Sequence, residues 1–178
     1  MNDFLERIQL IKKKEMKLPV SKSEFVNKLR ENIDEGNIGA FSGAFEAFSS
    51  SKNNYKGTIS HDTFEIRRRK ELFHRGANQA KVTGKFRQQG DHTIIDLEIN
   101  GFHYVIIAYY IFIIIFYILF LSFSGFLTVD IFSMFIVIHG ALMFCLPYIF
   151  LRKQTKNTAA EIEKELYFMM RKEEYYTM

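Results

Sequence analysis

Two long stretches without a charged side chain constrain this chain more than any other feature. No Asp, Glu, Lys or Arg occurs between Glu98 and Asp130, and none occurs between Asp130 and Arg152. A helix of 20 residues is about 30 Å long, which matches the hydrocarbon core of a bilayer. Core helices of water-soluble proteins are rarely apolar on every face. The sequence therefore predicts two membrane-spanning helices, at about 104–123 and 131–151, that form a short antiparallel hairpin.

Basic residues near the ends of these spans predict their orientation. Arg152, Lys153 and Lys156 follow the second span at once, whereas the loop 124–130 holds no Lys or Arg. Lys and Arg are enriched on the cytoplasmic side of membrane proteins, so we expect both termini in the cytoplasm and the loop outside. Residues 1–17 lack the apolar segment of a signal peptide, so the first span is expected to direct insertion.

The residues before the first span, 1–102, predict a small cytoplasmic α+β domain. Between roughly 55 and 100, a period of two in hydropathy indicates four short strands of an antiparallel meander with one apolar and one charged face. Helices are expected at 2–14 and from a capping box at Ser21 onward. The second helix carries an apolar stripe that could cover the sheet, formed by Phe25, Leu29 and Ile33.

Two further segments are amphipathic. Residues 39–50 are interpreted as a short helix or aromatic loop on the core, with insertion into the lipid surface as the alternative. Residues 152–178 are predicted to form a separate cytoplasmic helical tail, because Thr158 and Glu161 have the spacing of a capping box. We expect this tail to pack on the cytoplasmic domain or along the membrane interface, with a free partner-binding helix as the alternative. Its apolar side is formed by Ile162, Leu166, Met169 and Met170.

The junction between the last strand and the first span is short. Only residues 100–103 separate the two, so we expect the sheet to lie against the membrane surface. The basic run at the end of the second strand could then contact lipid phosphates, at about 1 kcal/mol per residue. The alternative is a solvated run that protects a sheet edge. Together with the basic residues after the second span, the candidate phosphate contacts are Arg67, Arg68, Arg69, Lys70, Arg152, Lys153 and Lys156.

His139 is the one ionisable residue close to the middle of a predicted span. A polar residue at that depth is a candidate functional site. The register of the hairpin brings Tyr117 within reach of His139, so a hydrogen bond that fixes the register is expected, with a proton or ion relay as the alternative. A stripe of small residues on the second span could contact a partner helix through Ser133, Gly140 and Ala141.

Signatures of catalysis are missing from the sequence. It contains no P-loop, GxGxxG, GxSxG, HExxH or CxxC pattern, so no catalytic residue, cofactor or metal is predicted. Cys145, the only cysteine, lies in an apolar segment where its thiol is expected to stay protonated and inert. Six polar residues could gather at one end of the sheet but fit no metal-ligand spacing, and these are His61, Asp62, His74, Asp91, His92 and Asp96.

The strand region leading into the first span resembles a recurrent pattern. The segments 55–73, 78–86 and 93–102, followed directly by a span, resemble small two-span membrane proteins of bacteria that have no established activity. The resemblance covers 55–123. It implies a bacterial inner membrane and the order of strands followed by a span, and it implies no site.

Taken together, these features predict a non-enzymatic, membrane-anchored cytoplasmic module that recruits, assembles or regulates a membrane partner. The expected partners are the bilayer, anionic lipid head groups, and a membrane protein or a second copy of the chain. The formal net charge of +4 is mild and does not indicate nucleic-acid binding. Two alternatives stay open: a subunit of a small oligomeric channel or transporter with a polar site near His139, and a membrane-bound enzyme acting on lipid head groups.

Overall fold

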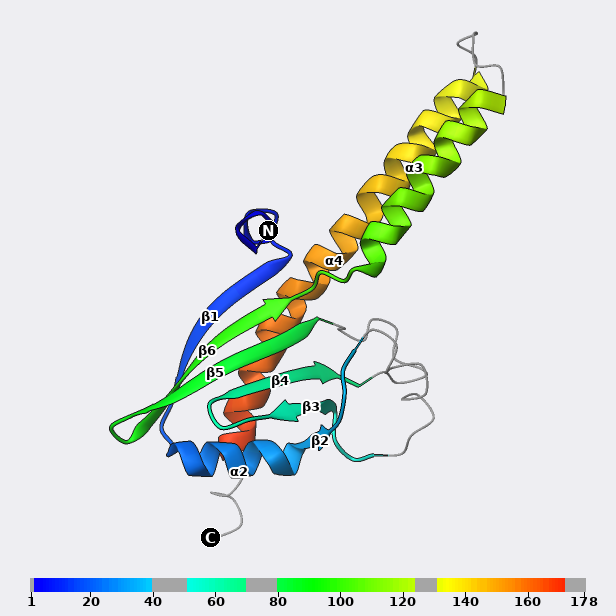
Figure 1. Ribbon diagram of the computed structural model, residues 1–178. Coiled ribbons are helices and arrows are strands. Elements are labelled where there is room, and N and C mark those ends of the chain that lie inside the picture. Colours follow the sequence, from blue (N-terminus) through cyan, green and yellow to red (C-terminus); the bar gives the residue numbers. More distant parts are fainter. Residues whose placement is uncertain (1, 40–50, 70–79, 124–130, 172–178) are drawn as a thin grey trace.

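The computed structural model describes residues 2–39, 51–69, 80–123 and 131–171, and within these ranges it contains a six-stranded sheet and four helices (Figure 1). The α+β class predicted from the sequence is confirmed. In chain order the elements are α1 (Asn2–Arg7), β1 (Ile11–Leu18), α2 (Lys22–Asn32), β2 (Ile33–Glu35), β3 (Tyr55–Ile59), β4 (Thr63–Arg68), β5 (Lys81–Gln89), β6 (His92–Asn100), α3 (Val105–Phe123) and α4 (Ile131–Arg171).

The sheet has the strand order β1-β6-β5-β4-β3-β2. The four strands predicted between 55 and 100 are β3 to β6, and they form the expected antiparallel meander with a tight turn at Gly90, whose φ is +59°. Two edge strands extend this meander. β1 pairs with β6 in antiparallel fashion, whereas β2 pairs with β3 in parallel, so the sheet is mixed rather than purely antiparallel.

The helix predicted over 2–14 is wrong beyond Arg7. Gln9 adopts a left-handed backbone conformation, with a φ of 61°, and this ends α1. From Ile11 onward the chain is extended and forms an eight-residue ladder with β6, from Ile11 opposite Asn100 to Leu18 opposite Thr93. The backbone hydrogen bonds of this ladder outweigh the local helical spacing of the apolar residues.

The capping box at Ser21 is confirmed as the start of α2. The Ser21 hydroxyl accepts a hydrogen bond of 3.2 Å from the Glu24 backbone N–H. Two positions of the predicted stripe, Phe25 and Leu29, are fully buried against the sheet. The third, Ile33, is also buried but begins β2 rather than continuing the helix.

Helix α4 runs without interruption from Ile131 to Arg171, so the separate tail helix predicted to begin at Thr158 is wrong. Thr158 lies inside the helix and is buried. We call α3 together with residues 131–151 of α4 the apolar hairpin, and residues 152–171 of α4 the stalk. The two helices of the hairpin lie side by side, and the stalk continues into the α+β domain (Figure 1).

The stalk and α2 cover the inner face of the sheet and together with it enclose the core. Ile162 and Leu166 of the stalk are fully buried, as expected for the apolar side of the C-terminal segment. β1 and β6 contact α4, and Figure 1 shows the sheet beside the stalk. The expectation that the sheet lies against the membrane surface stays a prediction.

Candidate functional site

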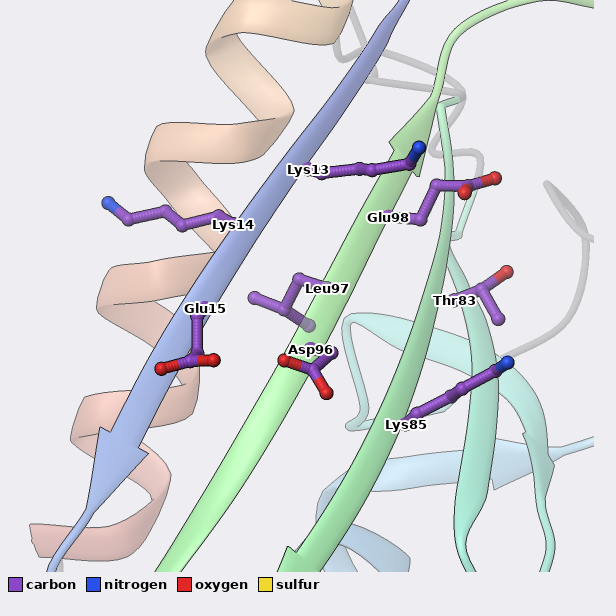
Figure 2. Close-up of a pocket in the computed structure, with 8 residues that line it drawn as sticks. All are labelled: Lys13, Lys14, Glu15, Thr83, Lys85, Asp96, Leu97 and Glu98. Atoms are coloured by element: carbon purple, nitrogen blue, oxygen red, sulfur yellow. The ribbon is translucent and has the colours of Figure 1, made fainter. Parts of the chain in front are cut away.

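The outer face of the sheet carries alternating charges and no described helix covers it. A shallow hollow of about 600 Å³ lies on this side, over β1, β6 and β5 (Figure 2). Arg87 binds Asp96 and lies 3.7 Å from Glu15, while Lys13 binds Glu6. These carboxylates compensate the lysine and arginine charges that face them. The hollow therefore presents a balanced polar surface and no convergent set of catalytic groups.

The first and third arginines of the basic run are buried. Arg67 and Arg69 are 4% and 8% exposed, and Arg69 binds Asp34 of β2. Hydrogen bonds from Ser51 and Asn53, together with Arg69, hold the pKa of Asp34 below its usual range. Arg69 therefore joins the end of β4 to the edge strand β2.

Arg68 points to the opposite face of the sheet from Arg67. Its guanidinium lies 3.2 Å from the carboxylate of Glu161 in the stalk. Lys70 lies outside the described residues. The described arginines of this run therefore do not form one exposed patch, and their contact with lipid phosphates stays a prediction. Among these three arginines, Arg67 lines the cavity described below.

The basic residues after the charge-free segment of α4 have exposed side chains. The Arg152 guanidinium donates a hydrogen bond of 2.8 Å to the Gln9 side chain. Lys153 and Lys156 are also exposed on the stalk. Their proposed contact with lipid phosphate stays a prediction.

His139 and Tyr117 meet inside the apolar hairpin. The Tyr117 hydroxyl lies 2.5 Å from His139 Nδ1, and the two groups share a hydrogen bond. The histidine ring is half-buried and stacks on Phe135, one helical turn earlier in α4. The arrangement joins the two helices at one level and matches the expected register; whether it has a further role stays a prediction.

Gly140 and Ala141, two of the small residues of α4, have different surroundings. A side chain added at Gly140 would lie 3.4 Å from the Tyr117 ring, so Gly140 lets α3 approach α4 within the hairpin. Ala141 is exposed, and the side chain of Ser133 lies outside the described residues. Gly140 therefore contributes to the contact between α3 and α4, and the packing of a partner helix on the small residues stays a prediction.

Two tyrosines of α3 bind the backbone of α4. The hydroxyls of Tyr109 and Tyr110 donate hydrogen bonds of 3.0 Å to the carbonyl oxygens of Met143 and Phe144. Both accepting carbonyls lie within one turn before Pro147. These contacts were not predicted from the sequence, although a proline inside an apolar helix signals that a carbonyl one turn earlier needs another donor.

The N-terminal segment fastens the base of the hairpin. The Tyr148 hydroxyl donates 3.1 Å to the Ile8 carbonyl, and the Gly101 N–H donates 2.9 Å to the Leu10 carbonyl. A side chain at Gly101 would overlap Thr155, which shows how closely the link 101–104 crosses the stalk. These contacts position the start of α3 relative to the ends of β5 and β6.

A cavity of about 880 Å³ lies at this junction, and we call it the junction cavity. Its described lining comes from the ends of β4, β5 and β6 nearest the hairpin, from the first turns of α3, from α4 around Pro147, and from parts of α1 and of residues 37–39. Its charged lining residues are Glu65, Arg67 and Lys81, and its apolar lining includes Val105 and Leu151. The junction cavity could not be predicted from the sequence, because it depends on how the strands are aligned.

The turn histidines and acids form no metal centre among the described residues. Asp62 binds Lys22 of α2, and this contact holds the pKa of Asp62 below its usual range. His61 Nε2 lies 3.9 Å from the same carboxylate. His74 lies outside the described residues, and Cys145 is exposed on the apolar hairpin.

Comparisons with protein-family models, curated proteins and solved structures found no match for this chain. The resemblance of residues 55–123 to two-span bacterial proteins stays a prediction. The structure itself contains two helices long and apolar enough to cross a membrane, joined to a mixed α+β domain.

Proposed function

We propose that this chain is a membrane-anchored module: the apolar hairpin crosses the bilayer, and the α+β domain presents a binding surface for a membrane partner on the cytoplasmic side. Only 6% of the residues in the most apolar window of each hairpin helix are buried. Exposed apolar side chains on this scale require another apolar environment, because contiguous apolar patches on soluble monomers are far smaller. A bilayer supplies that environment.

The observation that carries the proposal is the continuity of α4. The same helix forms half of the apolar hairpin and, through Ile162 and Leu166, part of the core of the α+β domain. Lys14 of β1 binds Glu163 of the stalk at 2.5 Å, which adds a contact along the same helix. The domain is thus held at a fixed position relative to the anchor, which suits a part that assembles or regulates a membrane neighbour.

The exposed lysines Lys153 and Lys156, with Arg152, support an orientation with both termini in the cytoplasm. Replacing Cys145 with Ser gives a cysteine-free background in which reporter cysteines can be placed. We expect a cysteine at Asp91 to be shielded from an impermeant thiol reagent in intact cells, and one at Thr128 to react. Reaction at both positions, or extraction of the protein by alkaline carbonate, contradicts the anchoring and its orientation.

Crosslinking from the outer face of the sheet tests whether this face binds the membrane partner. A photoreactive phenylalanine analogue at Lys85, on this face, is compared with one at Lys164, which is exposed on the stalk. We expect the first to crosslink reproducibly to one membrane protein or to a second copy of the chain, and the second not to. If both positions crosslink to the same unselective mixture of proteins, the sheet face is not the recruiting surface.

An oligomeric channel around His139 receives less support. The imidazole is engaged by Tyr117 within one hairpin, and this contact accounts for a polar residue at that depth without a conducting path. A lipid-headgroup enzyme would need groups placed for acid–base or nucleophilic chemistry, and the residues that the structure describes bring no such set together around the hollow or the junction cavity.

A further inference from the structure

The junction cavity combines two kinds of lining. The ends of β4, β5 and β6 contribute charged and polar side chains, whereas α3 and α4 contribute apolar ones, including Val105, Ile106 and Leu151. Its volume of about 880 Å³ lies in the range of cavities that hold small organic ligands. A ligand that matches both parts must carry a polar head and an apolar body.

The alignment of the strands concentrates positive charge beside this cavity. Lys56 of β3 is directly opposite Arg67 of β4. The β4–β5 register pairs Ile66 with Val82, and continued by one residue it sets Arg67 opposite Lys81. Asp34 of β2 is opposite Lys56 in the same row, so the row contains three basic residues and one carboxylate.

The charged residues that line the cavity favour an anion. Lys81 lies 2.7 Å from Glu65, so the single carboxylate among the described lining is already engaged with a lysine. Arg67 is 4% exposed and its guanidinium keeps its charge at any physiological pH. Its planar fork of N–H donors suits the oxygens of a phosphate group.

The location of the cavity indicates where the ligand comes from. Val105 begins α3, and Leu151 is the last residue before Arg152 on α4, so both apolar walls stand at the end of the charge-free segments. If the hairpin spans the bilayer, as proposed above, this is the depth of the inner-leaflet head groups. Tyr104, which is 76% exposed beside the cavity, is a residue type typical of that interface.

We propose that the junction cavity binds one anionic phospholipid, with its phosphate beside Arg67 and Lys81 and an acyl chain against Val105 and Leu151. This inference rests on the proposed membrane anchoring. It differs from a general attraction to an anionic surface, because it assigns one lipid to a defined cavity on one side of the hairpin. Basic pockets beside membrane helices are known to select anionic head groups in this manner.

The test uses the full chain purified in mild detergent and supplied with equal amounts of phosphatidylglycerol and phosphatidylcholine. Native mass spectrometry then counts the lipids retained. We expect one phosphatidylglycerol to be retained preferentially. Lys81→Gln should weaken its retention about fivefold, the factor that corresponds to the loss of one basic residue near a phosphate. The matched control is Lys85→Gln. Lys85 lies on the same strand and face as Lys81 but four residues farther from the hairpin, so this substitution should change retention less than twofold.

A second variant, Arg67→Gln, should also weaken retention, provided circular dichroism shows that it folds; Lys81→Gln decides the question if it does not. Equal retention of both lipids by the unmodified chain, or equal effects of the two lysine variants, overturns the proposal. Glycerophosphoglycerol, which has the head group without acyl chains, should not displace the lipid at millimolar concentration; displacement would mean that the cavity is an anion site and not a lipid site. Carbonate extraction of the membranes from which the chain is purified separates these results from a failure of membrane anchoring.

Discussion

The Tyr109 hydroxyl of α3 donates a hydrogen bond of 3.0 Å to the Met143 carbonyl of α4. In an uninterrupted α-helix this carbonyl accepts from the N–H of residue 147, but Pro147 has no N–H to donate. Within a bilayer a carbonyl without a donor costs several kcal/mol, because no water is present to replace it. Tyr109 thus supplies from the neighbouring helix the donor that Pro147 removes.

This relationship predicts a specific coupling between Tyr109 and Pro147. Tyr109→Phe should lower the free energy of unfolding of the hairpin by about 1 kcal/mol, within the range measured for hydrogen bonds between membrane helices. In a Pro147→Ala background the new N–H at residue 147 can bond to the Met143 carbonyl, so the same substitution should cost much less. Unfolding in mixed micelles, followed by circular dichroism, measures both values.

The matched control for this cycle is Tyr110→Phe. Tyr110 donates to the Phe144 carbonyl, whose own helical donor, the N–H of Tyr148, is not a proline nitrogen. Removing the Tyr110 hydroxyl should therefore lower the free energy of unfolding by the same amount with and without Pro147. An equal cost for Tyr109→Phe in the two backgrounds would show that the hydroxyl does not compensate for the proline.

The Tyr117–His139 hydrogen bond predicts a second coupling within the hairpin. Tyr117→Phe and His139→Leu should each destabilise the hairpin, and the double variant should show a coupling of roughly 0.6 kcal/mol, the average for such pairs. Ser122→Ala serves as a control, because the Ser122 hydroxyl bonds to the Ile118 carbonyl of its own helix. Independent effects of the two substitutions, measured by the same unfolding assay, would exclude a register role.

Part of this fold follows from periodicity. The alternation that predicted β3 to β6 reflects one buried and one solvated face, and the sheet has both. The edge strand β1 could not be predicted from the local pattern. Three consecutive lysines, Lys12 to Lys14, interrupt the alternation of apolar and polar residues, and the apolar residues before them have helical spacing. What decides its conformation is the ladder with β6, a contact between residues about 80 positions apart that no local pattern encodes.

The unbroken α4 shows a second limit of local signals. A Thr three residues before a Glu is typical of a helix start, but the same pair also lies on one side of a continuing helix. At Thr158 the stalk is packed against the sheet, and this tertiary contact keeps it helical. The contact of His139 with Tyr117 was predictable because a short loop fixes the alignment of two helices. The junction cavity was not predictable, because the chain between β4 and β5 does not determine that Arg67 lies opposite Lys81.

Lys28 caps the C-terminal end of α4, and this contact predicts a loss of stability when its ammonium group is removed. Its ammonium is buried and donates 2.9 Å to the Met170 carbonyl, in the last turn of α4, while Glu24 lies 3.0 Å away. A positive charge at a helix C-terminus satisfies an unbonded carbonyl and interacts favourably with the helix dipole. Lys28→Met should lower the free energy of unfolding of the domain by about 1–2 kcal/mol, as measured by thermal or urea unfolding in detergent.

The control for that substitution is Lys164→Met, at an exposed position of the same stalk, which should change the free energy of unfolding by no more than about 0.5 kcal/mol. Amide hydrogen exchange measures the local effect. Lys28→Met should speed exchange more in the last turns of α4 than in the rest of the helix. A uniform increase along α4 would argue against a capping role.

Tyr55 predicts a loss of stability in alkali. Burial in the core, where the phenol is 4% exposed, raises the pKa of Tyr55 to about 12, and the carboxylate of Glu165 adds to this effect. Because the folded-state pKa exceeds the value of about 10 in the unfolded chain, the stabilisation is complete below pH 10 and is lost as the pH rises toward 12. Two pKa units correspond to roughly 2–3 kcal/mol.

The variant Tyr55→Phe keeps the ring but removes the ionisable group. Its free energy of unfolding should therefore fall less than that of the parent chain between pH 9 and pH 11.5. Parallel curves for the two proteins over that interval would show that Tyr55 does not titrate with folding.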